Sequence, residues 1–69
     1  MTKLPSSEKV ILILRKNGYV FKSQKGSHQK FSRDGRVVIV PANRKEIPLG
    51  TLKSIARQSG INYSTFLNL

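Results

Sequence analysis

The most restrictive feature of the sequence is a pair of short turns that lie close together. Gly26-Ser27 and Asp34-Gly35 enclose the segment HQKFSR. Asp34-Gly35 is a strong hairpin signal, because both central positions of a type I′ turn adopt positive φ. The turns separate three short segments, which are YVFKSQK (19–25), HQKFSR (28–33) and RVVIVP (36–41). We therefore predict a three-stranded antiparallel meander, whose last strand ends where Pro41 removes a backbone donor.

A helix is predicted before this meander. Ser6 or Ser7 is a suitable N-cap, and the acidic Glu8 complements the helix dipole in the first turn. The apolar run VILIL follows, and Asn17-Gly18 supplies a left-handed stop. VILIL by itself also fits a buried strand, but the cap before it and the glycine after it favour a helix of about three turns.

A second helix is predicted after the meander, over approximately Gly50 to Ser59, with Gly60 as its end. Its apolar face would contain Leu49, Leu52, Ile55 and Ala56. A short final helical turn is expected to pack Phe66, Leu67 and Leu69 back onto the protein. The resulting order, α-β-β-β-α, is an α+β fold in which a three-stranded antiparallel sheet carries two helices on one face.

Chain length and composition narrow the range of functions. The chain has 69 residues, enough for a single domain that we predict to span residues 1–69. It has no cysteine, one histidine and three acidic residues. Neither a disulfide framework nor a cysteine-based zinc site is therefore possible, and a protein-only metal site is not expected. We also expect no cofactor, because so short a chain forms only shallow pockets.

The charge of the chain points to a polyanionic partner. The net charge is +10, from 13 Lys and Arg against three acids. Nucleic acid is the favoured partner of such a chain, and the alternatives are a solubilising surface, a membrane surface or an acidic protein. The apolar run Val10–Leu14 is far shorter than the roughly 20 residues of a transmembrane helix, and no signal peptide is recognisable. We therefore expect a cytoplasmic protein that does not bind membranes.

The single histidine, His28, is the candidate catalytic residue. It begins the second predicted strand, whose one large apolar side chain, Phe31, is expected to face the helices. Because side chains alternate between the faces of a strand, His28, Lys30 and Ser32 are expected on the uncovered face. The alternative interpretation is an ordinary surface histidine.

The residues around His28 are suited to holding a phosphate. Backbone N–H groups of the Gly26-Ser27 turn are able to hold a phosphate oxygen, although a plain turn explains these two residues equally well. A solvated strand face is the alternative for the nearby cations. The cations expected near the phosphate are Lys22, Lys25 and Lys30.

One histidine is able to perform one of the two proton transfers of RNA cleavage. RNA carries its own nucleophile, the 2′-OH, which attacks the neighbouring phosphorus when a base removes its proton, and an acid then protonates the leaving 5′-oxygen. Histidine exchanges protons near neutral pH and cations stabilise the charge that builds on the phosphate, so the reaction needs no metal. The second proton-transfer role would fall to a lysine, an arginine, water or the RNA itself.

Other polar and aromatic residues have two interpretations each. Lys53 and Arg57, one turn apart on the second helix, would either contact the backbone of an RNA duplex or keep the helix soluble. Tyr19 and Phe21 are expected to be core aromatics rather than platforms for stacking bases, because the strand lacks interleaved exposed aromatics.

Several segments together carry a family resemblance. They are NGYVF, KGSHQKF, VIVP, IPLGTLKSIARQSGI and STFLNL. With them, nearly the whole chain resembles the HicA-type mRNA interferase toxins of bacterial toxin–antitoxin pairs. GSH alone would be a weak signal, whereas GSH followed by P…LGTLKSIARQSGI is fairly specific.

This resemblance implies a fold like a double-stranded-RNA-binding domain and metal-independent cleavage of mRNA, with His28 as the catalytic residue. It also implies a HicB-like antitoxin that covers the active surface. The chain departs from the family at one position. Family members often carry a histidine two residues after the proline of the third strand, where this chain has Asn43. Asparagine exchanges no proton near neutral pH, so any acid–base help from that position is missing.

Two hypotheses from other functional classes stand beside the ribonuclease toxin, which is the leading prediction. The first is a module that binds duplex RNA without cutting it. The second is a DNA-binding domain that uses the helix with Lys53 and Arg57. It is disfavoured because that helix is short and offers few side chains that read bases.

Overall fold

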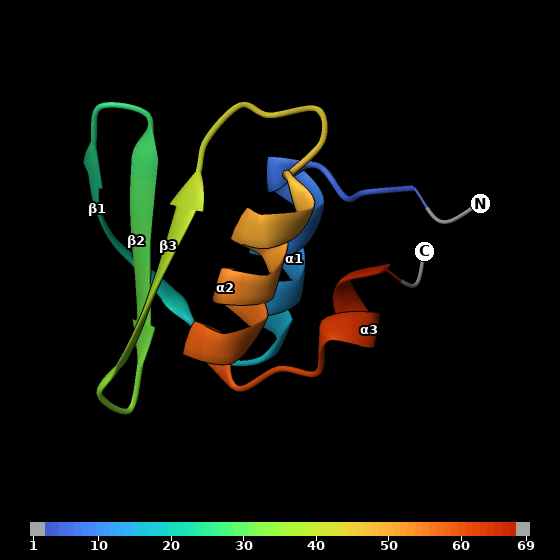
Figure 1. Cartoon of the computed structure of the whole chain (residues 1–69). Coiled ribbons are helices and arrows are strands. Elements are labelled where there is room, and N and C mark those ends of the chain that lie inside the picture. Colours follow the sequence, from blue (N-terminus) through green and yellow to red (C-terminus); the bar gives the residue numbers. More distant parts are fainter. Residues whose placement is uncertain (1–2, 68–69) are drawn as a thin grey trace.

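The computed structural model describes residues 3–67, which form an antiparallel sheet and a group of helices. The elements are α1 (Ser7–Lys16), β1 (Val20–Lys25), β2 (His28–Arg33), β3 (Arg36–Pro41), α2 (Leu49–Ser59) and the short α3 (Tyr63–Leu67). The strand order is β1-β2-β3, and Figure 1 shows the helices gathered on one side of the sheet. The structure confirms the predicted α+β fold of the α-β-β-β-α type, an arrangement like that of double-stranded-RNA-binding domains.

The predicted turns and helix ends are present. Asp34 and Gly35 have φ values of 48° and 82°, as the two positions of a type I′ turn require. The side chain of Ser6 accepts a hydrogen bond from the Lys9 backbone N–H, so Ser6 is the N-cap of α1. Gly18 follows α1 with a φ of 88°, and a Cβ there would lie 3.2 Å from Cδ of Arg33. Both its φ and its close neighbour favour glycine.

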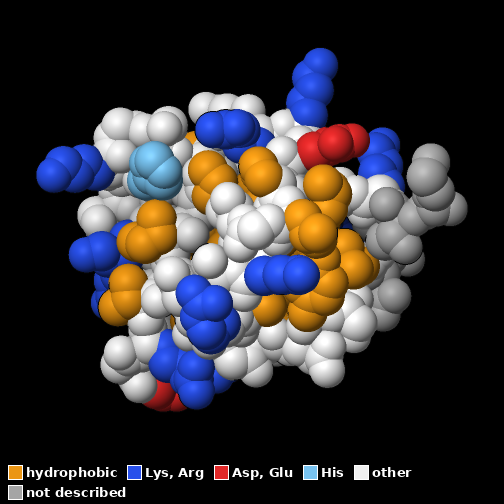
Figure 2. Space-filling model, in the orientation of Figure 1, with side chains coloured by type: hydrophobic (Ala, Val, Ile, Leu, Met, Phe, Trp, Pro, Cys, Tyr) orange, Lys and Arg blue, Asp and Glu red, His pale blue; other side chains and the backbone are white. Residues whose placement is uncertain are grey.

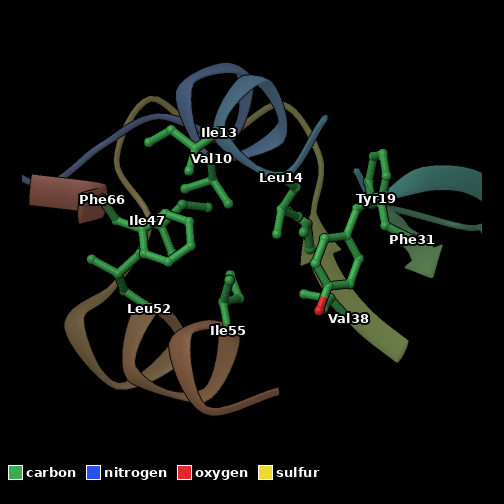
Figure 3. Packing of buried hydrophobic residues seen from close by; sticks show 11 residues of the cluster. Val10, Ile13, Leu14, Tyr19, Phe31, Val38, Ile47, Leu52, Ile55 and Phe66 are labelled. Atoms are coloured by element: carbon green, nitrogen blue, oxygen red, sulfur yellow. The ribbon is translucent and has the colours of Figure 1, made fainter. Parts of the chain in front are cut away.

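The core lies between the two long helices and the covered face of the sheet (Figure 3). Figure 3 shows Val10 and Leu14 of α1 facing Leu52 and Ile55 of α2. Phe66 of α3 lies at the end of this cluster opposite Tyr19 and Phe31. All of these side chains are buried. The predicted packing of Phe66 is therefore confirmed, Leu67 packs against the core from a partly buried position, and Leu69 lies outside the described residues.

Two expected core residues are instead exposed. Phe21 shares the covered face with its cross-strand partner Phe31, and their rings meet edge to face at 5.8 Å. Its exposed fraction is nevertheless 46%, because β1 lies at the sheet edge, away from the helices. Leu49 is also 46% exposed, since it begins α2 ahead of the part that packs on the core. The prediction for Tyr19 is correct: it is buried, and its hydroxyl donates to the Ser59 carbonyl at 2.6 Å.

The sheet contains one irregularity that the sequence does not indicate. Phe21 pairs with Phe31 while Ser23 pairs with Lys30, which leaves Lys22 as an extra residue in β1. Such a bulge bends its strand and increases the local twist. From Ser23 onward the register is regular, so that Lys25 lies opposite His28. None of the helices in residues 3–67 is long and apolar enough to cross a membrane.

Candidate active site

His28 lies on the uncovered face of the sheet, as its position in the sequence predicts. It is the first residue of β2, and its cross-strand partners are Lys25 of β1 and Pro41 of β3. Phe31 is fully buried, whereas His28 and Lys30 are exposed, which is the expected alternation. Figure 2 shows the histidine in pale blue at the surface, with Lys and Arg side chains close by.

A shallow hollow of about 430 Å³ opens beside the imidazole. Its lining consists of Ser23, Lys25, His28, Lys30 and Ile39. Two of the three lysines expected near a phosphate, Lys25 and Lys30, therefore border the same hollow as the histidine. An anion in this hollow would be close to two cations and one group able to exchange a proton.

The uncovered face is less uniformly basic than expected. Val20, Val37 and Ile39 are exposed large apolar side chains. Val20 and Val37 are both partners of Ser32, and Ile39 is the partner of Lys30. Paired residues share a face, so this side of the sheet is apolar toward Ser32 and basic toward His28.

The turn before His28 is held by two hydrogen bonds to its carbonyl groups. The Gly26 carbonyl accepts from Nε2 of Gln24 at 2.9 Å, and the Ser27 carbonyl accepts from the Ala42 backbone N–H at 2.6 Å. Gly26 has a φ of 59°, and a Cβ at this position would meet no heavy atom within 4 Å. Glycine is favoured here by backbone conformation rather than by crowding. The bonds fix the start of β2 and with it the position of His28.

Residues 7–61 match the family model described as the HicA toxin of bacterial toxin–antitoxin systems. The chain belongs to the HicA toxin family. The match includes α1, the whole sheet, α2 and therefore His28. A comparison with curated proteins gives no match. As a HicA-family member, the chain is a toxin of the kind that is paired with an antitoxin.

Three of the residues expected to bind RNA in this HicA-family toxin lie away from the hollow. Lys22 is the extra residue of the β1 bulge. Lys53 and Arg57 are exposed on α2, opposite the buried face that contains Leu52 and Ile55. Nη2 of Arg57 donates a hydrogen bond at 3.5 Å to Oγ of Ser54, a residue that borders a second hollow next to His28.

This second hollow is a groove of about 270 Å³ between the end of β3 and α2. His28 and Ile39 line both hollows, so the imidazole stands where the two meet. The other groove residues are Pro41, Arg44, Pro48, Thr51, Ser54 and Gln58. Oε1 of Gln58 accepts a hydrogen bond from the Ile39 backbone N–H at 3.2 Å, which joins α2 to the outer edge of β3. Sequence analysis missed these residues, because only folding brings α2 beside His28.

Ser7 forms hydrogen bonds with the loop that contains Arg44. This buried side chain donates a hydrogen bond to the Pro41 carbonyl at 2.6 Å and accepts one from the Arg44 N–H at 2.9 Å. The Ser7 N–H in turn donates to the Arg44 carbonyl at 2.9 Å. Both ends of the segment from Pro41 to Arg44 are therefore tied to the start of α1. The backbone of Arg44 is fixed while its side chain is exposed.

Asn43, the position at which the chain departs from the family pattern, lies outside both hollows. It has a φ of 58°, a left-handed conformation that asparagine adopts more readily than most residues. It borders a separate hollow beside the N-terminus of α1, together with Ser6, Ser7 and Glu8. In this structure the residue at this position therefore lines neither of the hollows that His28 lines. Within residues 3–67, no group of three or more His, Asp or Glu side chains is arranged to hold a metal ion.

Proposed function

We propose that this toxin is a metal-independent endoribonuclease, an mRNA interferase that arrests translation and growth by cutting mRNA. The observation that carries the proposal is the exposed imidazole of His28 in a hollow bordered by Lys25 and Lys30. Membership of the HicA family supports it, since this family is associated with RNA cleavage. The substrate, mRNA, places the action of the toxin in the cytoplasm, and residues 1–69 act as one toxin domain.

In the proposed reaction the 2′-oxygen of one ribose attacks the adjacent phosphorus. A base removes the proton from the 2′-OH, the new bond joins the 2′-oxygen to phosphorus, and the bond from phosphorus to the 5′-oxygen breaks. An acid returns a proton to that oxygen. The products are a 2′,3′-cyclic phosphate and a 5′-OH. His28 performs one of these proton transfers, and the other falls to a lysine, an arginine, water or the RNA.

The remaining sequence-predicted residues bind the RNA backbone in this proposal. Lys25 and Lys30 stabilise the negative charge that develops on the phosphate beside His28. The backbone N–H groups of Gly26 and Ser27 contact a phosphate oxygen. The more distant cations, Lys22, Lys53 and Arg57, attract the polyanion without touching the reacting phosphate.

Incubation of the purified protein with a defined mRNA tests this proposal. We expect cleavage in the presence of excess chelator, because the nucleophile belongs to the RNA and the proton transfers belong to side chains. The cleaved ends should be a 2′,3′-cyclic phosphate and a 5′-OH, identified by mass spectrometry. A DNA strand of the same sequence is the matched control and should remain intact, since it lacks the 2′-OH. Cleavage of that DNA, or loss of RNA cleavage with chelator, would contradict the mechanism.

A non-catalytic module that binds duplex RNA is the second candidate function. It is favoured by Lys53 and Arg57, which are exposed on α2, line neither hollow beside His28 and would contact a duplex backbone. Intact RNA after prolonged incubation, together with measurable binding of a duplex, would establish this function in place of the first.

We further propose that the antitoxin is a HicB-like protein that binds the face of the sheet opposite the helices, where His28 lies. A partner with acidic residues would neutralise Lys25 and Lys30 and bury the exposed Val37 and Ile39.

The rate at which this acidic antitoxin associates with the toxin should fall by about 10²-fold or more from low to high salt, because steering between opposite charges is screened. Stopped-flow mixing measures this rate. The double substitution Lys25→Gln/Lys30→Gln should weaken the salt dependence more than Lys53→Gln, and a rate that does not respond to salt would contradict the electrostatic account.

A further inference from the structure

The groove between β3 and α2 has no role in the cleavage reaction proposed above, yet His28 forms part of its wall. We propose that this groove binds one nucleotide of a single-stranded RNA, the neighbour of the scissile phosphate, with Arg44 holding its phosphate. The inference rests on the proposed ribonuclease function and adds a subsite to it. Strand continuity then places the nucleotide on the other side of the scissile phosphate in the hollow with Lys25 and Lys30.

The composition of the groove fits a nucleotide. Ile39, Pro41 and Pro48 offer apolar surface to a ribose and the face of a base. Thr51 and Ser54 offer hydroxyl groups that are able to donate and to accept hydrogen bonds. A nucleotide needs both kinds of surface, because its sugar and base have apolar faces and polar edges.

The polar side chains of the groove are presented in an ordered row. Thr51, Ser54 and Gln58 are spaced three and four residues apart, so they lie on one face of α2. Oε1 of Gln58 is occupied by the Ile39 N–H, which leaves the amide NH₂ as a donor. The groove therefore presents a fixed donor beside two hydroxyls, an arrangement able to discriminate among base edges.

The charge arrangement is consistent with one RNA strand running past His28. Arg44 is in the groove on one side of the imidazole, and Lys25 and Lys30 are in the hollow on the other. Ser7 hydrogen-bonds both the N–H and the carbonyl of Arg44, so the backbone from which the Arg44 side chain extends is held in place. Its guanidinium is able to contact a phosphate through two N–H groups.

The groove selects single-stranded RNA rather than a duplex. Bases of an RNA duplex are stacked and paired, so they are not free to enter hollows on two sides of one side chain. Bases of a single strand can be splayed apart and held separately. Lys53 and Arg57, which are exposed on α2 and do not line the groove, are the residues that a duplex would contact instead.

Binding measurements in a His28→Ala background, in which the RNA stays intact, test the groove. Fluorescence anisotropy with a short single-stranded RNA should show that Arg44→Gln lowers affinity by about tenfold, because a charge-assisted contact to phosphate is lost. The matched control is Lys45→Gln, which removes one positive charge from the adjacent loop residue, outside this groove. It should lower affinity by about twofold. Equal losses in the two variants would overturn the proposal.

Two further readouts separate the groove from the cleavage mechanism. Titration of the labelled protein with the single strand should shift the backbone NMR signals of Ile39, Arg44 and Thr51, and Thr51→Val should change the relative affinities for poly(A), poly(C) and poly(U). If these signals and affinities do not change while the wild type still cleaves RNA, the groove proposal is wrong and the ribonuclease stands. If the Arg44 effect is present but no RNA is cleaved, the groove stands and the ribonuclease is wrong. A duplex that binds with the same dependence on Arg44 would overturn the selection of single strands.

Discussion

Replacing His28 by alanine is expected to lower the rate of RNA cleavage by at least about 10²-fold, the smallest effect usual for removal of a general acid or base. The imidazole is exposed and begins its strand, so its removal leaves the buried core unchanged. Circular dichroism and thermal unfolding of the variant should match those of the wild type. RNA affinity should change by no more than about threefold, because Lys25, Lys30 and the other cations remain.

The same experiment distinguishes chemistry from binding through a second variant. Lys30→Gln should weaken RNA binding and cleavage together, since it removes a cation beside the phosphate. His28→Ala should reduce the rate at saturating RNA while leaving affinity nearly unchanged. If His28→Ala cleaves RNA at the wild-type rate, the imidazole has no part in the reaction and the ordinary surface interpretation of His28 is correct.

Replacing Ser7 by alanine is expected to lower the free energy of unfolding by about 2–4 kcal/mol. The substitution removes the partner of the Pro41 carbonyl and of the Arg44 N–H, and each buried polar group left unpaired costs about 1–3 kcal/mol. For a chain of this size, 1 kcal/mol corresponds to about 4–8 °C in Tm. The decrease in Tm should therefore be on the order of 10–20 °C, measured by circular dichroism or calorimetry.

An exposed serine provides the control for this prediction. Ser64 lies on the surface of α3, and Ser64→Ala should change stability by no more than about 0.5 kcal/mol. A Tm for Ser7→Ala equal to that of Ser64→Ala would show that the bonds joining α1 to the loop with Arg44 do not contribute to folding. In that case Arg44 would also lose the fixed backbone on which its proposed phosphate contact depends.

Features that depend on local chemistry were predictable from the sequence. The Asp34-Gly35 turn follows from the backbone conformation that its two residues adopt, and this turn alone specifies an antiparallel pair. The exposure of His28 follows from the alternation of side chains along a strand once Phe31 is assigned to the core. Neither inference needs knowledge of how the helices pack.

Features that depend on packing between distant segments were not predictable. Alternation assigns Phe21 to the correct face of the sheet, but its exposure depends on how far the helices extend over β1. The register break that displaces Lys22 has no turn residue or proline to indicate it. The place of Arg44 beside His28 depends on a hydrogen bond to Ser7, 37 residues away in the chain. No periodicity in the sequence reports a contact of that kind.

The bond between Gln58 and Ile39 also affects how well the folded toxin avoids self-association. An uncovered strand edge offers unpaired N–H groups to other chains, which is a common route to aggregation. In β3 the Gln58 side chain occupies the Ile39 N–H, while in β1 the bulge and the charge of Lys22 make the opposite edge unsuitable for a new strand. We therefore expect Gln58, which also lines the groove, to limit the addition of another strand at this edge. A substitution of Gln58 that alters the proposed base preference would also free the Ile39 N–H at this strand edge, so altered specificity and freedom from aggregation have to be selected together.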